Sequence, residues 1–212
     1  MRSNRKTLAL TINADAQLVV RAPLRMPEKD IQAFVEKKSQ WIARKQKQVL
    51  DAAARHKLFR LEDGESILFL GKQRIVFLED VPEILIEESR ITIPKNMTLE
   101  GFIRWVKGKS EIVIGERVEH YASLMNVSYT VIKMSNAKKR WGSCSAQDRL
   151  NFAWRLVMCP AWVIDYVVVH ELSHISFKDH SPRFWALVAT QILNYKEARS
   201  WLRSNHKLVD VL

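Results

Sequence analysis

The stretch VVVHELSHISFKDH, residues 167–180, places three histidines and one glutamate at the end of a strongly apolar run. On a helix, His170 and His174 project from one face, because residues four apart stand one above the other. Two imidazoles placed in this way can share one metal ion. Glu171 can reach a metal-bound water without ligating the metal, and it can accept the proton of that water. The spacing therefore predicts a hydrolytic metal site with Glu171 as the catalytic acid/base.

A third protein ligand is needed, since a catalytic zinc usually has three ligands and one open position. His180 follows His174 by six residues and precedes a Ser-Pro helix start, so a loop histidine there can fold back onto the metal. An exposed loop histidine is the plain alternative, and Glu197, the only later glutamate, is another candidate ligand. We expect one zinc ion (Zn2+) per chain, held by His170, His174 and His180. Asp165 and Asp179 are candidate partners for the histidine N–H groups.

The metzincin class of zinc enzymes shares this spacing of the second and third histidines, but it requires a glycine between them and a later methionine turn. Phe177 stands at the glycine position here, and no methionine follows the motif. The sequence therefore excludes the metzincin class.

A basic loop, NAKKRWGSCS, precedes this motif. Arg140, with Lys138 and Lys139, can bind a carboxylate or phosphate, and Trp141 can stack on a substrate. A tight turn that packs Trp141 into the core is an equal alternative. Cys144 lacks a second base that would make it a nucleophile. The loop therefore supplies candidate substrate contacts.

Composition narrows the partners and the compartment. The net charge of +11 favours polyanions such as nucleic acid, nucleotides or acidic protein, although a solvated basic surface is equally consistent. No stretch of 18 or more apolar residues is present, so we expect no membrane span. The two cysteines give no disulfide framework, and we expect a cytoplasmic protein.

Hydrophobic periodicity predicts an α+β fold in two parts. Residues 1–97 form a β-rich N-terminal region with one long basic helix, and residues 98–212 form the metal-binding catalytic domain; we place the boundary in PKNMTLEG. Strands are expected in three hairpins, at residues 6–23, 66–80 and 83–94, again at 127–134, and at the end of NAKKRWGSCSAQDRLNFAW. Helices are expected at 26–56, 102–125, 160–175, 182–193 and 195–205. Within this arrangement Trp162, Phe184 and Trp185 should pack in the core.

Three ordered blocks carry a family resemblance: KKRWGSCS, LNFAWRLVMCP and VIDYVVVHELSHISFKDHSPRFW. With them the chain resembles the YgjP-like metallopeptidase domain family, distant relatives of the SprT-like zincins. The segments VRAP and FLGKQ extend the resemblance over nearly the whole chain, and DRLNF departs from it at one turn, where a glycine commonly precedes the strand. The resemblance implies a zincin-like minimal metallopeptidase domain with an HExxH helix, His170, His174 and His180 as ligands, and Glu171 as acid/base. It does not bring a substrate class with it.

Three functions are consistent with these residues. The leading one is a zinc-dependent peptidase in which Glu171 activates a metal-bound water. The alternative is a metal-dependent nucleoside triphosphate pyrophosphohydrolase whose anionic substrate is bound by Lys138, Lys139 and Arg140. A site of histidines alone argues against it, because magnesium sites usually need carboxylates. A third is a protein that also binds nucleic acid through the basic helix around KKSQWIARKQKQ.

Overall fold

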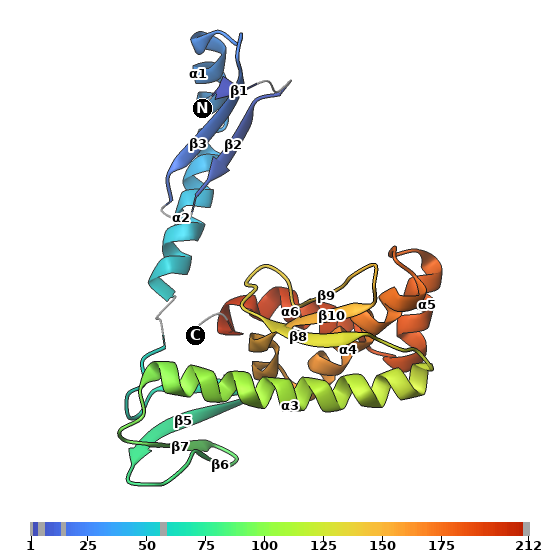
Figure 1. Ribbon diagram of the computed structural model, residues 1–212. Helices are drawn as coiled ribbons and strands as arrows, with labels where there is room; N and C mark the ends of the chain where they lie inside the picture. Colours follow the sequence, from blue (N-terminus) through green and yellow to red (C-terminus); the bar gives the residue numbers. More distant parts are fainter. Residues whose placement is uncertain (1, 4–6, 14–15, 56–58, 210–212) are drawn as a thin grey trace. The chain divides into compact units, whose positions relative to one another are not determined.

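The computed structural model describes residues 2–3, 7–13, 16–55 and 59–209. Contacts divide the chain into two compact units, Met1–Lys57 and Leu58–Leu212, which are described separately below. The described residues form three small sheets and six α-helices (Figure 1). This mixed composition agrees with the predicted α+β class.

The first unit joins a small sheet to two helices. Strand β2 (Ala9–Ile12) pairs antiparallel with β3 (Leu18–Pro23), which confirms the predicted first hairpin, and β1 (Arg2–Ser3) pairs parallel with β3. The helix predicted from residue 26 is interrupted at Lys38, so that α1 (Glu28–Lys37) and α2 (Ser39–Arg55) are separate. The Gln46 side chain donates a hydrogen bond to the Ala16 carbonyl at 2.9 Å and ties α2 to the hairpin turn.

The second unit begins with a four-stranded sheet in the order β4-β5-β7-β6. Its strands are β4 (Ser66–Phe69), β5 (Lys72–Glu79), β6 (Leu85–Ile86) and β7 (Arg90–Pro94), which confirms both predicted hairpins. Gly71 forms the first bend with a φ of +72°, and a Cβ there would lie 2.6 Å from Pro160 Cα. Only glycine allows this bend to approach the start of the helix that carries the HELSH motif.

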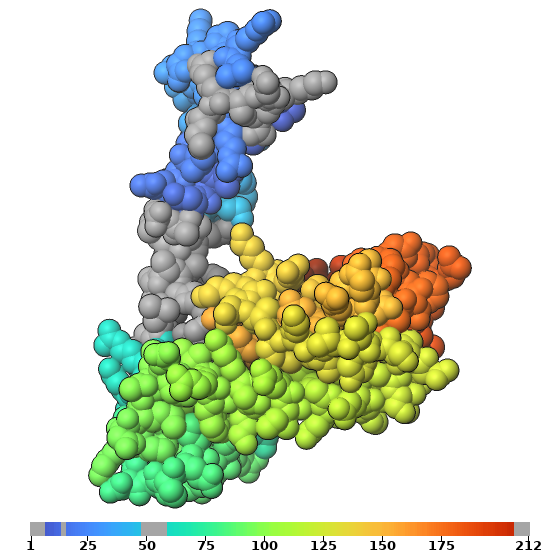
Figure 2. All heavy atoms as spheres, viewed as in Figure 1, coloured from blue at the N-terminus to red at the C-terminus, as the bar shows by residue number. Residues whose placement is uncertain are grey.

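A 27-residue helix, α3 (Leu99–Met125), runs along this unit (Figure 1). Thr98 begins it, because its side chain accepts a hydrogen bond from the Gly101 N–H at 3.1 Å. The helix continues through Gly108 and Gly115 without a break. Its buried residues recur at helical spacing and include Phe102, Val106, Ser110, Ile114 and Val118. In the space-filling view the green side chains of α3 cover much of the front of this unit (Figure 2).

The remaining elements surround the HELSH motif. The third sheet has the order β8-β10-β9, with β8 (Val131–Ser135) parallel to β10 (Arg149–Ala153) and β9 (Gly142–Cys144) antiparallel to β10 at the edge. The stretch containing β9 was predicted as a loop. A 3-10 turn, η1 (Trp154–Met158), leads into α4 (Ala161–Ser176), and α5 (Pro182–Gln191) and α6 (Tyr195–Val209) follow.

One hydrophobic core unites the second unit. Buried side chains of the four-stranded sheet, such as Ile67 and Ile91, join those of α3 and α4, such as Phe102 and Val168. The boundary predicted after residue 97 is therefore not where the compact units meet, because the sheet at residues 66–94 shares its core with the helices that follow. Among the described residues, no helix is both long and apolar enough to cross a membrane.

Candidate metal centre

Helix α4 carries the HELSH motif. Pro160 begins the helix, and the first turns bury Val163, Ile164 and Val167. The β-branched run at residues 167–169 is helical, as predicted, because its side chains are buried in the core around the helix. His170 and His174 stand one turn apart on this helix, with ring centroids 5.0 Å from each other.

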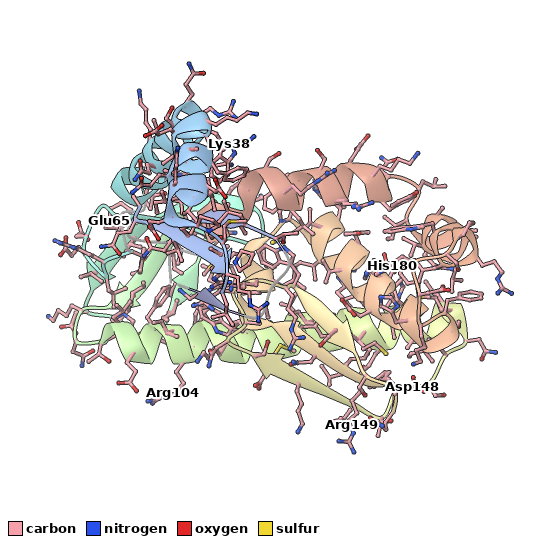
Figure 3. The ribbon with its side chains drawn as sticks, turned by 90° about the horizontal axis from the view of Figure 1, so that it is seen from above. Lys38, Glu65, Arg104, Asp148, Arg149 and His180 are labelled. Carbon is pink, nitrogen blue, oxygen red and sulfur yellow. The ribbon has the colours of Figure 1, made fainter. Side chains whose placement is uncertain are left out.

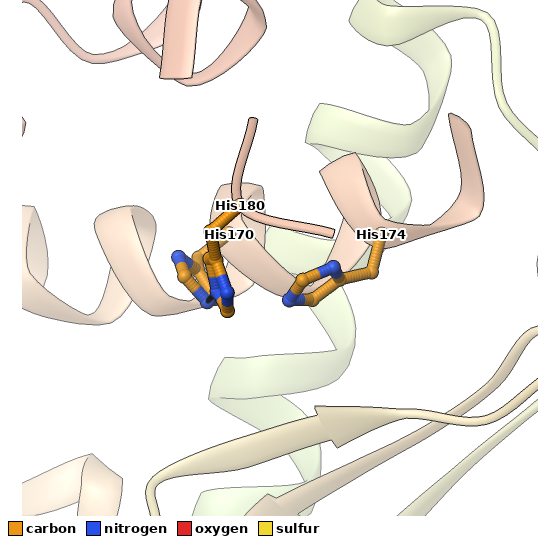
Figure 4. A group of neighbouring side chains, drawn as sticks. All are labelled: His170, His174 and His180. Atoms are coloured by element: carbon orange, nitrogen blue, oxygen red, sulfur yellow. Dashed lines mark hydrogen bonds between the residues drawn. The ribbon is translucent and has the colours of Figure 1, made fainter. Parts of the chain in front are cut away.

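The third histidine comes from the loop between α4 and α5, where its label marks the site in Figure 3. Phe177 leaves the helical region with φ −134° and ψ 108°, which ends α4 and turns the chain back. His180 Nε2 then lies 3.1 Å from His170 Nε2, and ligand atoms of His170, His174 and His180 all lie within 4.8 Å of one another (Figure 4). The structure thus brings the three predicted ligands together.

The histidine rings fit a metal ion chemically. His174 Nδ1 lies 3.0 Å from the Phe177 carbonyl, which leaves its Nε2 free to ligate. Burial, with the charges of His174 and His180, lowers the pKa of His170 to about 3, and burial also lowers the pKa of His174. Both rings are therefore neutral near pH 7, the form in which imidazole binds metal. Tetrahedral zinc holds its nitrogen ligands roughly 3.3 Å apart, a spacing close to that of the two Nε2 atoms.

Aromatic rings from α5 and α6 support the histidines. The His180 ring stacks on Trp185, with centroids 5.6 Å apart, and Trp185 in turn stacks on Tyr195 at 5.3 Å. His174 lies 4.6 Å from the buried Phe184 ring. Phe184 and Trp185 pack as predicted. Trp162 does not, since it is 44% exposed in the first turn of α4.

Glu171 lies on the same helix and is only 6% exposed. Burial raises its pKa to about 7, and the positive charge of Arg140 opposes that rise. Gly142 of β9 covers it so closely that a Cβ there would lie 2.6 Å from Glu171 Cγ and from Oε1. The carboxyl group is therefore held between α4 and the edge strand of the sheet.

A cavity of about 480 Å³ opens beside Glu171 and His170. Trp141 lines it and also packs against the hydrophobic core, which agrees with the predicted packing and leaves substrate contact a prediction. Arg140 lines a different groove of about 620 Å³ on the small sheet, together with Lys133 and Arg149. Lys138 and Lys139 are exposed, and neither lines the cavity beside Glu171.

The expected partners of the histidine N–H groups differ in the structure. Asp165 pairs with Arg117, whose Nε lies 3.3 Å from Oδ1, and Asp179 accepts a hydrogen bond from the Ser181 N–H at 3.1 Å. A backbone carbonyl, that of Phe177, serves His174 instead. Glu197, the alternative third ligand, is exposed and lies outside the histidine group.

Both cysteines are free thiols. Burial raises the pKa of Cys144 and, further, that of the fully buried Cys159. A raised pKa keeps a thiol protonated and unreactive, which agrees with the interpretation that Cys144 is not a nucleophile.

Three residues of the cavity were not found from the sequence: Tyr166 on α4, and Arg199 and Arg203 on α6. The two arginines are four residues apart, a spacing that places both on one helix face. That spacing alone did not identify them, because only the packing of α6 against α4 brings this face to the site.

A protein-family model described as YgjP-like, metallopeptidase domain, matches residues 6–205. Among curated protein sequences none matches significantly. Among solved structures, the crystal structure of the metallopeptidase zymogen of Pyrococcus abyssi abylysin is similar, with a TM-score of 0.37 and 16% sequence identity. That similarity covers 42% of this chain and 93% of the other.

Proposed function

Because the chain belongs to the YgjP-like metallopeptidase domain family, we propose that it is a zinc-dependent peptidase in which Glu171 is the catalytic acid/base. Family membership places the chain among the metal-dependent peptidases. To this family assignment we add three proposals: that the metal is zinc, that the three histidines are its ligands, and that Glu171 is the acid/base.

One observation carries this proposal: ring nitrogens of His170, His174 and His180 converge, and His170 lines the same cavity as the buried Glu171. Three imidazoles form a ligand set that suits zinc, and catalytic zinc sites with three protein ligands keep a fourth position for water. Among the described residues no other group of three or more histidines, cysteines and carboxylates is placed to hold a metal ion.

A zinc ion held by these histidines supplies a Lewis acid that polarises a carbonyl and acidifies water. The residues of the chain do the rest. Glu171 accepts a proton from the attacking water and delivers it to the nitrogen of the leaving amine. Its side chain is only 6% exposed, and Gly142 of β9 lies directly against it. Arg140 is our candidate for stabilising negative charge that develops on the substrate, because its charge acts on Glu171 from the neighbouring groove.

The edge strand β9 favours a peptide as the substrate. Its backbone pairs with β10 on one side only, and Gly142 brings it against Glu171. An extended peptide can add to such an edge through backbone hydrogen bonds, which would place its carbonyl groups near the carboxyl group.

A nucleoside triphosphate pyrophosphohydrolase is the second candidate. The groove lined by Lys133, Arg140 and Arg149 favours it, because three cations there can bind phosphate. The absence of a carboxylate cluster in the described part of the chain counts against it, since magnesium prefers such ligands.

The deciding experiment compares the zinc-loaded wild-type protein with Glu171→Gln on an unfolded protein and on a panel of nucleotides. We expect the wild type to cut the unfolded protein and the variant to lose at least about 100-fold in rate, since general acid–base catalysis contributes at least that much. Turnover of nucleotides alone, dependent on Glu171, would establish the second candidate. Equal activities of both proteins on every substrate would refute both.

We also propose that the protein is cytoplasmic and that its first unit binds nucleic acid. The two free thiols support a reducing compartment. Exposed basic residues on α1 and α2, among them Lys37, Arg44 and Lys47, support the binding role. Retention of the protein on immobilised DNA should fall steeply with salt concentration, whereas salt-independent passage through the column would contradict the role.

A further inference from the structure

Two arginines of α6 line the cavity that contains Glu171. Arg199 and Arg203 are one helical turn apart, and both guanidinium groups are exposed. Like charges at this spacing repel each other slightly, and an anion bound by both guanidinium groups would relieve that repulsion. In the described part of the chain neither arginine forms an ion pair with a carboxylate.

The surroundings of the arginines fix Arg199 and the helix that carries both residues. The Arg199 guanidinium lies 5.2 Å from the Trp185 ring centroid, in a cation–π contact. Leu202 between them is buried and anchors this stretch of α6. A neighbouring hollow of about 340 Å³, which also includes Lys196, shares both arginines, so positive charge continues beyond the cavity.

The other walls of the cavity are aromatic or aliphatic. Trp141, Tyr166, Val167 and Leu202 line it, and Glu171 is the only acidic side chain among its lining residues. A ligand that matches this cavity would place an apolar stem against these walls and a terminal negative charge at the arginines. A planar carboxylate matches the guanidinium fork through paired hydrogen bonds.

We propose that Arg199 and Arg203 form a subsite for a peptide carboxylate, which makes acidic peptides the preferred substrates of this enzyme. The subsite rests on the proposed peptidase function, because it lies in the same cavity as Glu171. The carboxylate is either an aspartate or glutamate side chain next to the cleaved bond, or the free C-terminus of the substrate.

Randomised peptide mixtures distinguish these two sources. One mixture has amidated C-termini and the other free C-termini, and mass spectrometry locates the bonds that the zinc-loaded wild type cuts. Enrichment of Asp or Glu at one position in the amidated mixture identifies a side chain. Cleavage at a fixed distance from the end, in the free mixture only, identifies the C-terminus. An absence of both patterns in peptides that are cut overturns the subsite.

Substitutions then test the arginines directly. We expect Arg203→Gln and Arg199→Gln each to lower kcat/KM roughly 10- to 100-fold for a carboxylate peptide, the effect of one charged hydrogen bond. The kcat/KM for the matched neutral peptide should change less than about 3-fold, because that peptide has no carboxylate for the arginines to bind. Arg203→Glu should make the enzyme prefer peptides that carry lysine in place of the aspartate or glutamate. Arg104→Gln on α3, whose side chain is 79% exposed, is the matched control and should change nothing. Equal losses for acidic and neutral peptides would contradict the subsite.

A binding measurement separates failure of the subsite from failure of the peptidase function. Fluorescence anisotropy reports binding of the same labelled peptides to zinc-loaded Glu171→Gln, with and without Arg203→Gln. Binding that depends on both the carboxylate and Arg203 supports the subsite even if the wild type cuts no peptide, in which case the peptidase function alone fails. Two results overturn the subsite. In the first, peptide binding does not depend on Arg203. In the second, a nucleoside triphosphate binds more tightly than any carboxylate peptide, and that binding depends on Arg203.

Discussion

Gly142 on the edge strand β9 lies against Glu171 on α4 so closely that a single methyl group on the glycine would overlap the glutamate side chain, at 2.6 Å from Cγ and Oε1. The motif RWGSCS and the motif HELSH are thereby parts of one site. The glycine is required by this close approach and not by backbone conformation, since its φ is not positive.

Gly142→Ala tests this relationship. The added methyl group must displace the Glu171 carboxyl group, so we expect peptidase activity to fall about 100-fold or more, as it does when a catalytic group is misplaced by roughly 1 Å. Bound zinc should remain unchanged, because no histidine is displaced. Gly108→Ala is the matched control: nothing lies within 4 Å of its Cβ. It should keep full activity and stabilise α3 by about 0.5–1 kcal/mol. Full activity in Gly142→Ala would show that Glu171 does not act from this position.

Trp185→Ala tests how His180 is held. Trp185 stacks on the His180 ring and is itself supported by Tyr195. Loss of such a supporting contact costs roughly 10-fold in metal affinity or more, and we expect that effect in a competitive zinc titration. Trp162→Ala removes an exposed tryptophan from the first turn of the same helix and should leave zinc affinity unaltered. Equal affinities of both variants would mean that the loop holds His180 without the stack.

The pH dependence of stability tests the buried Asp165. Burial raises its pKa, while Arg117 and a hydrogen bond from Tyr121 partly offset the rise. A carboxyl group with a raised folded-state pKa favours the protonated form in the folded state, so stability is lost as pH rises through that pKa. Asp165→Asn should therefore gain stability relative to the wild type as pH rises above about 3.9, the ordinary aspartate pKa, as measured by urea unfolding.

Glu88→Gln is the opposite case and serves as the control. The hydrogen bond from Lys72 lowers the pKa of Glu88, so its stabilising effect is present above the unfolded-state pKa and is lost as pH falls. The variant should lose stability relative to the wild type as pH rises toward about 4.3, the ordinary glutamate pKa, and should show no further change above it. If both variants changed with the same sign, the burial of Asp165 would not control its titration.

The sequence predicted the elements with strong periodicity and the residues of the HELSH motif. Helix α4 and its histidines follow from spacing, and the hairpins around Gly71 and residues 87–89 follow from turn residues. The interruption at Lys38 was not predicted, because one turn residue leaves no periodic signal. The strand β9 was not predicted, because three residues are too few to show a period.

The arrangement around the metal site depends on contacts between distant segments. Two aspartates were expected as partners of the histidine N–H groups, but the Phe177 carbonyl contacts His174 instead. The sequence could not predict this contact, because a backbone carbonyl carries no sequence signal. Arg199 and Arg203 reach the cavity only because α6 packs on α4. The boundary expected after residue 97 does not separate the compact units because the sheet of residues 66–94 contributes to the same core as α3.

The zinc content of the purified protein tests the central claim most directly. Elemental analysis after dialysis should find one zinc ion per chain in the wild type and in Glu171→Gln, since the carboxyl group is not a ligand. It should find little in His170→Ala, His174→Ala or His180→Ala, each of which removes one of the three converging nitrogens. No zinc in the wild type under zinc-replete expression, or undiminished zinc in all three histidine variants, would contradict the proposed metal centre.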